Sequence, residues 1–421
     1  MFEKKDTYFP IKNDAACQLK WTWSTLILTE GTTSSCHRCL KVPLDENNFD
    51  NFHNLPFKIK EREIMLADKW PTKENGGSGH CNYCKKIEEQ GGTSDRIHHL
   101  SIPNLTPKEL ETNNLATSVT PKILEVFLNN TCNMSCVYCS SRNSTKISNE
   151  GRRFGPVKNT DGIIYQYTQE HKNIKKQRFF FEKTLEYIIK NGNELSRLHL
   201  LGGETFYQSE LREILDVLNL LKNPNLELNI VSNLMIKQDQ FEKYITEIKK
   251  LIKDRKIGRF DLTCSIDGFG PEAEYARYGL NSAHWKKLFE YAVNEKWIVL
   301  NTNQTITSLT LKSIPDLLYF INEKRKKRKI NTHFGLVDGR PHLHPEIFGK
   351  EFWKKDIENI ISMMTENNRD EIYAKKYMQG CFLGFKDKAD LTLIMELKHF
   401  LTEIDKRRKT NWKNVFPYLD I

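Results

Sequence analysis

The chain has 421 residues, a formal net charge of +10 and a hydrophobic fraction of 38%. This length suits a barrel-sized domain plus one smaller domain, and the hydrophobic fraction, although low, exceeds that of a disordered chain. Residues 1–6 lack the apolar segment of an export signal and no run of about 18 apolar residues occurs, so we expect a cytosolic protein that does not enter a membrane.

Ten cysteines are present in this chain. The cytosol keeps thiols reduced, so the cysteines favour metal binding or redox chemistry over disulfides. The excess of positive charge suits an anionic or nucleic-acid partner, and it is equally compatible with solubility alone.

Five cysteines lie in the first hundred residues: Cys17, Cys36, Cys39, Cys81 and Cys84. A strand is predicted over residues 21–29 and a turn at Glu30-Gly31, so the first cysteines would flank a β-hairpin. The second to fifth cysteines form two CxxC pairs, which is the spacing of zinc knuckles, so zinc and an iron–sulfur cluster are both open interpretations. Residues 76–80, just before the second pair, are predicted to be a flexible loop.

Residues 101–121 contain three prolines and few apolar residues, which is typical of a linker. We therefore expect four parts: a small cysteine-rich domain over residues 1–100, the linker, an α/β domain over residues 122–340, and a helical extension over residues 341–421 that packs on it.

The most informative motif follows a predicted strand at residues 123–128. It is Cys132-x3-Cys136-x2-Cys139. Three thiolates at this spacing can hold three irons of a cubane cluster and leave the fourth iron open to a substrate. A structural zinc site would need a fourth ligand, and none lies nearby in the sequence.

This spacing resembles the motif of the radical S-adenosylmethionine (SAM) superfamily. The resemblance implies that Cys132, Cys136 and Cys139 hold a 4Fe-4S cluster, that SAM chelates the open iron, and that Tyr138 lies beside the adenine. It also implies an electron donor such as a flavodoxin or ferredoxin. One electron would cleave SAM to a 5'-deoxyadenosyl radical, which abstracts a hydrogen from the substrate.

From residue 122 onward, apolar runs alternate with helical patterns. The predicted strands are at residues 123–128, 197–201, 226–231, 260–268, 297–306 and 332–337. Six such units predict an α/β fold, a partial (β/α)6 TIM-like barrel with ligands at the C-terminal strand ends. Residues 142–177 are polar and without clear periodicity, so we interpret them as a cover over the barrel mouth.

Polar residues follow several of these strands, at positions that hold SAM in similar proteins. Gly202-Gly203-Glu204 ends the second strand, where glycines permit close approach and the carboxylate can pair with an ammonium group. By the same resemblance the other SAM contacts are Ser232, Asn233, Ser265, Asp267 and Arg277. Short polar side chains at strand ends also cap helices, and Arg277 also suits a surface ion pair.

The N-terminal cysteine pattern is similar to the twitch domain, the shorter relative of the SPASM domain, which carries an auxiliary 4Fe-4S cluster in some radical SAM enzymes. This match assigns Cys17, Cys36, Cys81 and Cys84 as ligands and leaves the role of Cys39 open. Twitch domains usually follow the barrel, whereas this one would precede it.

Together these patterns predict a radical SAM enzyme with two clusters, acting on a peptide or on a sugar or alcohol. The auxiliary cluster would bind the substrate or accept an electron. The alternative is a zinc-knuckle protein that binds nucleic acid without catalysis, through basic runs such as residues 324–329. Few aromatic residues are interleaved with those runs, which counts against it. His342 and His344 are candidates for acid–base work or structural residues, and Cys264 and Cys381 are predicted to be structural.

Overall fold

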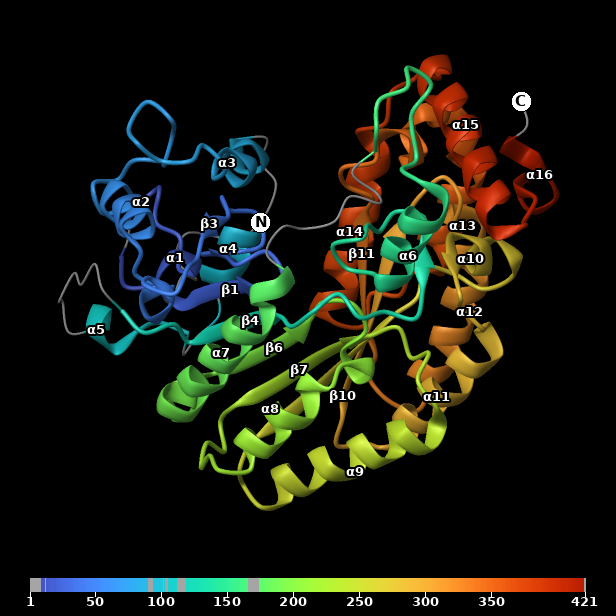
Figure 1. Cartoon of the computed structure of the whole chain (residues 1–421). Coiled ribbons are helices and arrows are strands. Elements are labelled where there is room, and N and C mark those ends of the chain that lie inside the picture. The colour runs from blue at the N-terminus through green and yellow to red at the C-terminus, as the bar shows by residue number, and fades with distance from the viewer. Residues whose placement is uncertain are drawn as a thin grey trace.

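The computed structural model describes residues 9–11, 13–89, 94–100, 102, 105–111, 119–165 and 174–419. Six parallel strands form its centre (Figure 1). They are β4 (Ile123–Phe127), β6 (Arg197–Leu201), β7 (Glu227–Ser232), β8 (Arg259–Ser265), β10 (Val299–Ile306) and β11 (Asn331–Leu336). They lie side by side in chain order, so each of the six predicted strands is confirmed to within a few residues.

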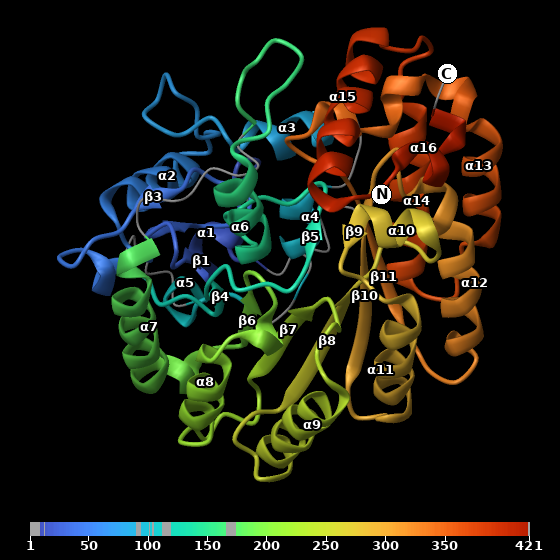
Figure 2. The same ribbon diagram turned by 45° about the vertical axis from the view of Figure 1, so that its right-hand side comes forward.

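Helices cover one side of these strands, as Figure 2 shows. They are α7 (Gln177–Asn191), α8 (Glu210–Leu218), α9 (Gln238–Lys253), α11 (Ser282–Asn294) and α12 (Ile314–Arg325). In α9 the buried residues Phe241, Ile245 and Ile248 recur every three or four positions, which places one apolar stripe against the sheet.

The strands alternate between an apolar outer face and a polar inner face. Leu198 and Leu200 of β6 are fully buried among the helices, whereas His199 between them is partly exposed. His199 is aligned with Glu125 of β4, and its Nδ1 lies 3.2 Å from the Glu125 carboxylate. The inner face of the sheet therefore offers polar groups to anything that lies inside it.

The predicted N-terminal hairpin is present, but it is part of the central sheet. Strand β1 (Trp23–Ile27) pairs antiparallel with β2 (Thr32–Ser34), which pairs with β3 (Val42–Pro43). β1 also pairs in parallel with β4, with Thr25 aligned to Glu125. The sheet order is β11-β10-β8-β7-β6-β4-β1-β2-β3. Residues 21 and 22, predicted to be in the strand, belong to the short helix α1 (Leu19–Thr22).

Four further helices belong to the N-terminal part: α2 (Pro56–Leu66), α3 (Asn82–Glu89), α4 (Asp95–Leu100) and α5 (Lys108–Glu111). Much of the predicted linker, including residues 103, 104 and 112–118, lies outside the described residues. The boundaries of the four predicted parts stay a prediction.

Residues 142–177 show no clear periodicity in the sequence, yet their first third contains helix α6 (Thr145–Phe154). The helix begins after Ser144, whose hydroxyl oxygen accepts a hydrogen bond from the Ile147 backbone N–H and donates one to the Met134 carbonyl at 2.6 Å. The role of residues 142–177 as a cover over the barrel mouth stays a prediction. Residues 166–173 of this segment lie outside the described residues.

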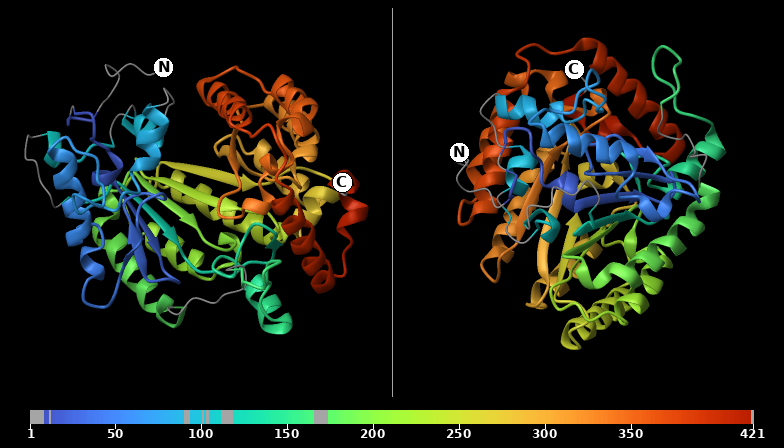
Figure 3. Two further views of the ribbon diagram at one scale, coloured as in Figure 1. Left: turned by 90° about the horizontal axis from the view of Figure 1, so that it is seen from above. Right: turned by 90° about the vertical axis from the view of Figure 1, so that its left-hand side faces the viewer.

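The C-terminal part consists of α13 (Lys350–Met363), α14 (Arg369–Leu383), α15 (Leu391–Arg408) and α16 (Trp412–Val415). Their apolar side chains, such as Trp353, Phe400 and Trp412, form a second buried cluster. The N-terminal part, in blue, and these helices, in orange and red, stand on two sides of the strands (Figure 1, Figure 3). Within the described ranges, none of the helices has the length and apolar character needed to cross a membrane.

Candidate functional site

The loop with the three central cysteines leaves the C-terminal end of β4. Within it, β5 (Ser135–Cys136) pairs antiparallel with β9 (Arg277–Tyr278), so that Cys136 is aligned with Arg277. The loop is closed by the Asn130 side chain, which donates to the Ser141 carbonyl at 2.9 Å, and by the Cys139 N–H, which donates to the Cys136 carbonyl at 3.0 Å. The sequence motif is therefore held in one defined conformation.

The three thiols lie close enough to affect one another electrostatically. Burial, with the neighbouring Cys136 acting in the same direction, raises the pKa of Cys139 to about 12. Burial also raises the pKa of Cys132, with Cys136, Glu204 and Cys139 acting in the same direction. Such thiols become thiolates when a metal replaces their protons, so this donor set fits the cluster that the sequence predicts.

Gly202 and Gly203 let the end of β6 lie directly against the cysteine loop. A Cβ on Gly203 would lie 2.2 Å from the Thr131 carbonyl oxygen, and Gly202 has a φ of 132°. The Gly203 N–H donates to the Asn129 carbonyl at 2.9 Å, and the Glu204 N–H donates to the Thr131 carbonyl at 2.7 Å. In this structure the glycines thus give close approach to the loop that carries Cys132.

Glu204 is fully buried between two strand ends. Its carboxylate accepts hydrogen bonds from the Ser232 hydroxyl at 2.7 Å and from the Asn233 backbone N–H at 2.6 Å. Burial raises the pKa of this carboxyl to about 7, against which these hydrogen bonds act. The protonated form of this carboxyl is therefore favoured up to a higher pH than in an exposed glutamate.

Asn233 connects the end of β7 to the cysteine loop. Its side-chain amide donates to Asn133 Oδ1 at 3.0 Å and lies 3.9 Å from Cys132 Sγ. Its amide oxygen accepts from the Met235 N–H at 2.7 Å, which closes a local turn; the N-cap of the next helix, α9, is Lys237, so the alternative that Asn233 caps this helix is wrong. Ser232, Asn233 and Glu204 thus meet beside Cys132.

Tyr138, Asp267 and Arg277 form a triangle of hydrogen bonds, in which Asp267 and Arg277 are buried and Tyr138, within the loop, is partly buried. The Tyr138 hydroxyl donates to Asp267 Oδ2 at 2.5 Å and accepts from Arg277 Nη1 at 2.7 Å. Asp267 Oδ1 also accepts from the Thr305 N–H at 2.9 Å. Only 6% of Arg277 is exposed, so the alternative of a surface ion pair is wrong. Its positive charge lowers the pKa of Cys136, against the larger effect of burial.

The remaining strand-end residue, Ser265, is the last residue of β8 and is aligned with Asn303 of β10. Cys264 beside it is fully buried in the core, as predicted. His342 packs against Tyr165 and Phe400, and burial lowers its pKa to about 4. His344 Nδ1 accepts from the Glu346 N–H at the start of a short 3-10 helix, so both histidines have structural contacts.

The five N-terminal cysteines line one cavity of about 30 Å³, together with Lys20 and Arg96. We call this cavity the thiol pocket; its thiols are those of Cys17, Cys36, Cys39, Cys81 and Cys84. Cys36 Sγ and Cys39 Sγ lie 3.2 Å apart, and Lys20 Nζ lies 3.1 Å from Cys39 Sγ. Burial opposes the charge on Lys20, yet its pKa lies well above the ordinary value because Cys39 and Cys81 face it. Sequence reasoning missed Lys20.

Among the described residues, no group of three or more His, Cys, Asp or Glu side chains is arranged so that it could hold a metal ion. A cubane distributes its sulfur ligands over four irons, so it requires a wider spacing of sulfurs than one ion does.

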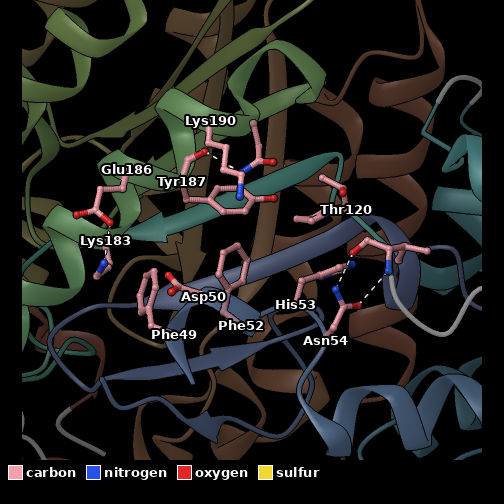
Figure 4. Close-up of a pocket in the computed structure, with 13 residues that line it drawn as sticks. Phe49, Asp50, Phe52, His53, Asn54, Thr120, Lys183, Glu186, Tyr187 and Lys190 are labelled. Carbon is pink, nitrogen blue, oxygen red and sulfur yellow. Dashed lines mark hydrogen bonds and ion pairs between the residues drawn. The ribbon is translucent and has the colours of Figure 1, made fainter. Parts of the chain in front are cut away.

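Two other cavities are larger than the thiol pocket. One, of about 440 Å³, lies between residues 49–54, residues 119–121 and helix α7, where Tyr187 and Lys183 face it (Figure 4). It is at the N-terminal end of β4, the opposite end from the cysteine loop. The other, of about 550 Å³, is lined by His37, Arg38, Cys39, Leu40, Lys41, His80, Tyr83 and Asp338. Cys39 thus lines both this cavity and the thiol pocket.

The basic run at residues 324–329 makes intramolecular contacts. Lys329 Nζ lies 2.8 Å from the Asp370 carboxylate and Lys324 Nζ lies 2.5 Å from that of Glu290. Arg328 donates to backbone carbonyls, including that of Glu295 at 2.9 Å. The basic side chains at the end of α12 thus form ion pairs and hydrogen bonds with neighbouring parts of the chain.

No protein-family model matches the chain, and no curated protein matches it. Solved structures give distant likenesses. Streptococcus suis SuiB bound to precursor peptide SuiA is 14% identical, with a TM-score of 0.34, over 91% of this chain and 68% of that one. SuiB bound to S-adenosylmethionine is 15% identical, with a TM-score of 0.35, over 91% and 69%. Native anSMEcpe with bound AdoMet is 15% identical, with a TM-score of 0.37, over 63% of each chain. These TM-scores lie below 0.5, so the proposal below rests on the site itself.

Proposed function

We propose that the protein is a radical SAM enzyme. The observation that carries the proposal is the loop of residues 129–139, which places three cysteines after the end of a parallel strand and to which the ends of β6 and β7 are hydrogen-bonded. A bound 4Fe-4S cluster with one open iron would supply one-electron cleavage of SAM to a 5'-deoxyadenosyl radical. The six parallel strands in chain order support the partial (β/α)6 barrel of such an enzyme.

The strand-end residues would bind and orient SAM. Glu204 would accept the ammonium group, and because its pKa is raised to about 7 it would give up its proton as the cation binds. Tyr138 would lie against the adenine, with its ring fixed by the hydroxyl bond to Asp267. Asp267 also orients Arg277, which would pair with the SAM or substrate carboxylate. The proposed ribose and methionine contacts are Ser232, Asn233, Ser265 and Asp267.

We also propose a second, auxiliary 4Fe-4S cluster in a twitch-like N-terminal part, with Cys17, Cys36, Cys81 and Cys84 as ligands. The thiol pocket supports this proposal because it collects all four thiols beside two buried cations, Lys20 and Arg96. The cations would offset the charge of a thiolate cluster. The fifth thiol, Cys39, competes for a ligand position because it contacts Cys36.

The substrate would enter from the cavity of about 550 Å³, which lies between the thiol pocket and Asp338, two residues after β11. A peptide, a sugar or an alcohol would suit the proposed hydrogen abstraction, and a cytoplasmic flavodoxin or ferredoxin would deliver the electron. The outcome of the reaction would depend on the second cluster, which could bind the substrate or accept an electron from it.

Anaerobic reconstitution with iron and sulfide tests the proposal. We expect about eight irons per chain, falling to about four when Cys132, Cys136 and Cys139 are all changed to Ala. With dithionite and SAM, the unaltered protein should release 5'-deoxyadenosine and the triple variant should not. Cys381→Ala, which removes a partly buried thiol in α14, is the matched control and should keep both properties. Zinc in place of iron, or equal release by the triple variant, would contradict the proposal.

A further inference from the structure

Lys20 is a buried cation in the wall of the thiol pocket. Only 2% of it is exposed, and its ammonium group lies 3.1 Å from Cys39 Sγ. It also forms an ion pair with the carboxylate of Glu61, which is equally buried. An ammonium group is costly to remove from water unless charged or hydrogen-bonded partners surround it. Lys20 therefore requires such partners at this buried position.

Glu61 holds Lys20 in place and at the same time fixes the loop before the second CxxC pair. One carboxylate oxygen, Oε2, pairs with Lys20. The other, Oε1, accepts from the Ser78 N–H at 3.1 Å and from the Ser78 hydroxyl at 2.7 Å. Ser78 precedes Cys81 by three residues. The loop predicted to be flexible is therefore tied to the same carboxylate that orients the ammonium group toward the sulfurs.

Lys20 and Arg96 are the buried cations in the wall of the pocket. A second buried lysine, Lys58, is also 2% exposed, and its amine donates to neutral acceptors: the Ser24 and Thr33 hydroxyls and the Ser34 carbonyl. Burial lowers the pKa of Lys58 well below its ordinary value, so we assign Lys58 no part in balancing the charge of a cluster. A four-iron cluster with four thiolate ligands carries a net charge of about −2, which the positive charges of Lys20 and Arg96 would complement.

We propose that Lys20 is the positioning cation of the second centre: it donates an N–H···S hydrogen bond to Cys39, whose sulfur contacts that of the ligand Cys36, and it offsets the negative charge of the sulfur ligands. The inference rests on the auxiliary cluster proposed above. Hydrogen bonds to the sulfurs and local net charge set both how tightly a cluster is held and its reduction potential. Lys20 acts through the sulfur atoms and need not touch the substrate.

The test uses the chain in which Cys132, Cys136 and Cys139 are Ala, because only the second centre then remains. Lys20→Met alone would leave Glu61 buried without its cation, so the main variant is Lys20→Met with Glu61→Gln. Lys20→Arg keeps the charge. Lys60→Met, an exposed lysine on α2, is the control for loss of a lysine ammonium group outside the pocket. Circular dichroism confirms that each variant is folded.

We expect the double variant to hold its iron about 10–100-fold less tightly against a chelator. Its midpoint potential in an EPR-monitored titration should be lower, because the N–H···S bond from the ammonium group to the sulfur is lost; the paired loss of Glu61 leaves the net charge of the chain unchanged. Lys20→Arg should keep most of the potential, and Lys60→Met should change neither property. A folded double variant with unchanged retention and potential would overturn the inference.

An iron-free triple variant would also overturn the inference. The two proposals can fail separately. If the triple variant holds no iron but the unaltered chain releases 5'-deoxyadenosine, the SAM proposal still stands. If the chain holds the second cluster but releases no 5'-deoxyadenosine, the SAM proposal is wrong.

Discussion

Changing Gly203 to Ala tests whether glycine is required where the end of β6 contacts the cysteine loop. The new Cβ would lie 2.2 Å from the Thr131 carbonyl oxygen, 2.6 Å from its carbonyl carbon and 2.8 Å from the Asn130 carbonyl carbon. Real Cβ atoms do not approach that closely, so the backbone at residue 131 must move by roughly an ångström. Overpacking of this kind costs about 1–3 kcal/mol.

The same movement weakens the hydrogen bond from the Glu204 N–H to the Thr131 carbonyl, which is now 2.7 Å long. Loss of one such bond costs about 0.5–1.5 kcal/mol. We therefore expect Gly203→Ala to lower the free energy of unfolding by about 2–4 kcal/mol. Because Cys132 follows Thr131, the reconstituted variant should also hold fewer than the expected eight irons.

Urea unfolding of the metal-free chain measures the free energy, and iron analysis after reconstitution measures the second effect. Gly380→Ala is the matched control, because a Cβ there meets nothing within 4 Å and the residue lies in α14. Alanine in a helix should raise stability by up to about 1 kcal/mol. An unfolding free energy for Gly203→Ala equal to that of the unaltered chain would refute the reasoning.

Three further predictions concern the buried charges and the thiol pocket. Arg277→Met should lower the free energy of unfolding by about 3–5 kcal/mol, because it leaves Asp267 buried without its cation, and adding Asp267→Asn should recover part of this loss in the same urea assay. Because the pKa of Glu204 is raised above its unfolded value to about 7, its ionisation should destabilise the fold increasingly between about pH 4.5 and pH 7, by about 3 kcal/mol above that range. Glu204→Gln should remove this pH dependence, and a retained slope would contradict it. Of five single Cys→Ala variants of the thiol pocket, four should lose the second cluster and one should keep it. The variant that keeps its cluster identifies the cysteine that is not a ligand. If two or more variants keep the cluster, a fixed set of four ligands is excluded.

The sequence predicted the parallel strands well because each is a short apolar run that ends in polar residues. Gly202-Gly203-Glu204 and Ser232-Asn233 were correctly expected at strand ends, and the structure brings them together beside Cys132. What the sequence could not show is that Glu204 bonds to Ser232 across two strands. That contact depends on the register of β6 and β7, which pairs residues about thirty positions apart.

Long-range pairing also explains the larger misses. Strand β1 joins β4 across a hundred residues, and no local pattern predicts this. Helix α6 was missed because its residues are mostly polar, and its start depends on the contact of Ser144 with Met134. Lys20 resembles any surface lysine in the sequence; only its contacts with Glu61 and Cys39 show that it is buried.

The most direct test of the central claim, that one iron at Cys132, Cys136 and Cys139 stays open for SAM, is an EPR measurement on the reduced, reconstituted protein. Adding SAM should change the spectrum of one cluster in the unaltered chain, and this change should be absent when the three cysteines are Ala. A spectrum that is the same with and without SAM would contradict the account.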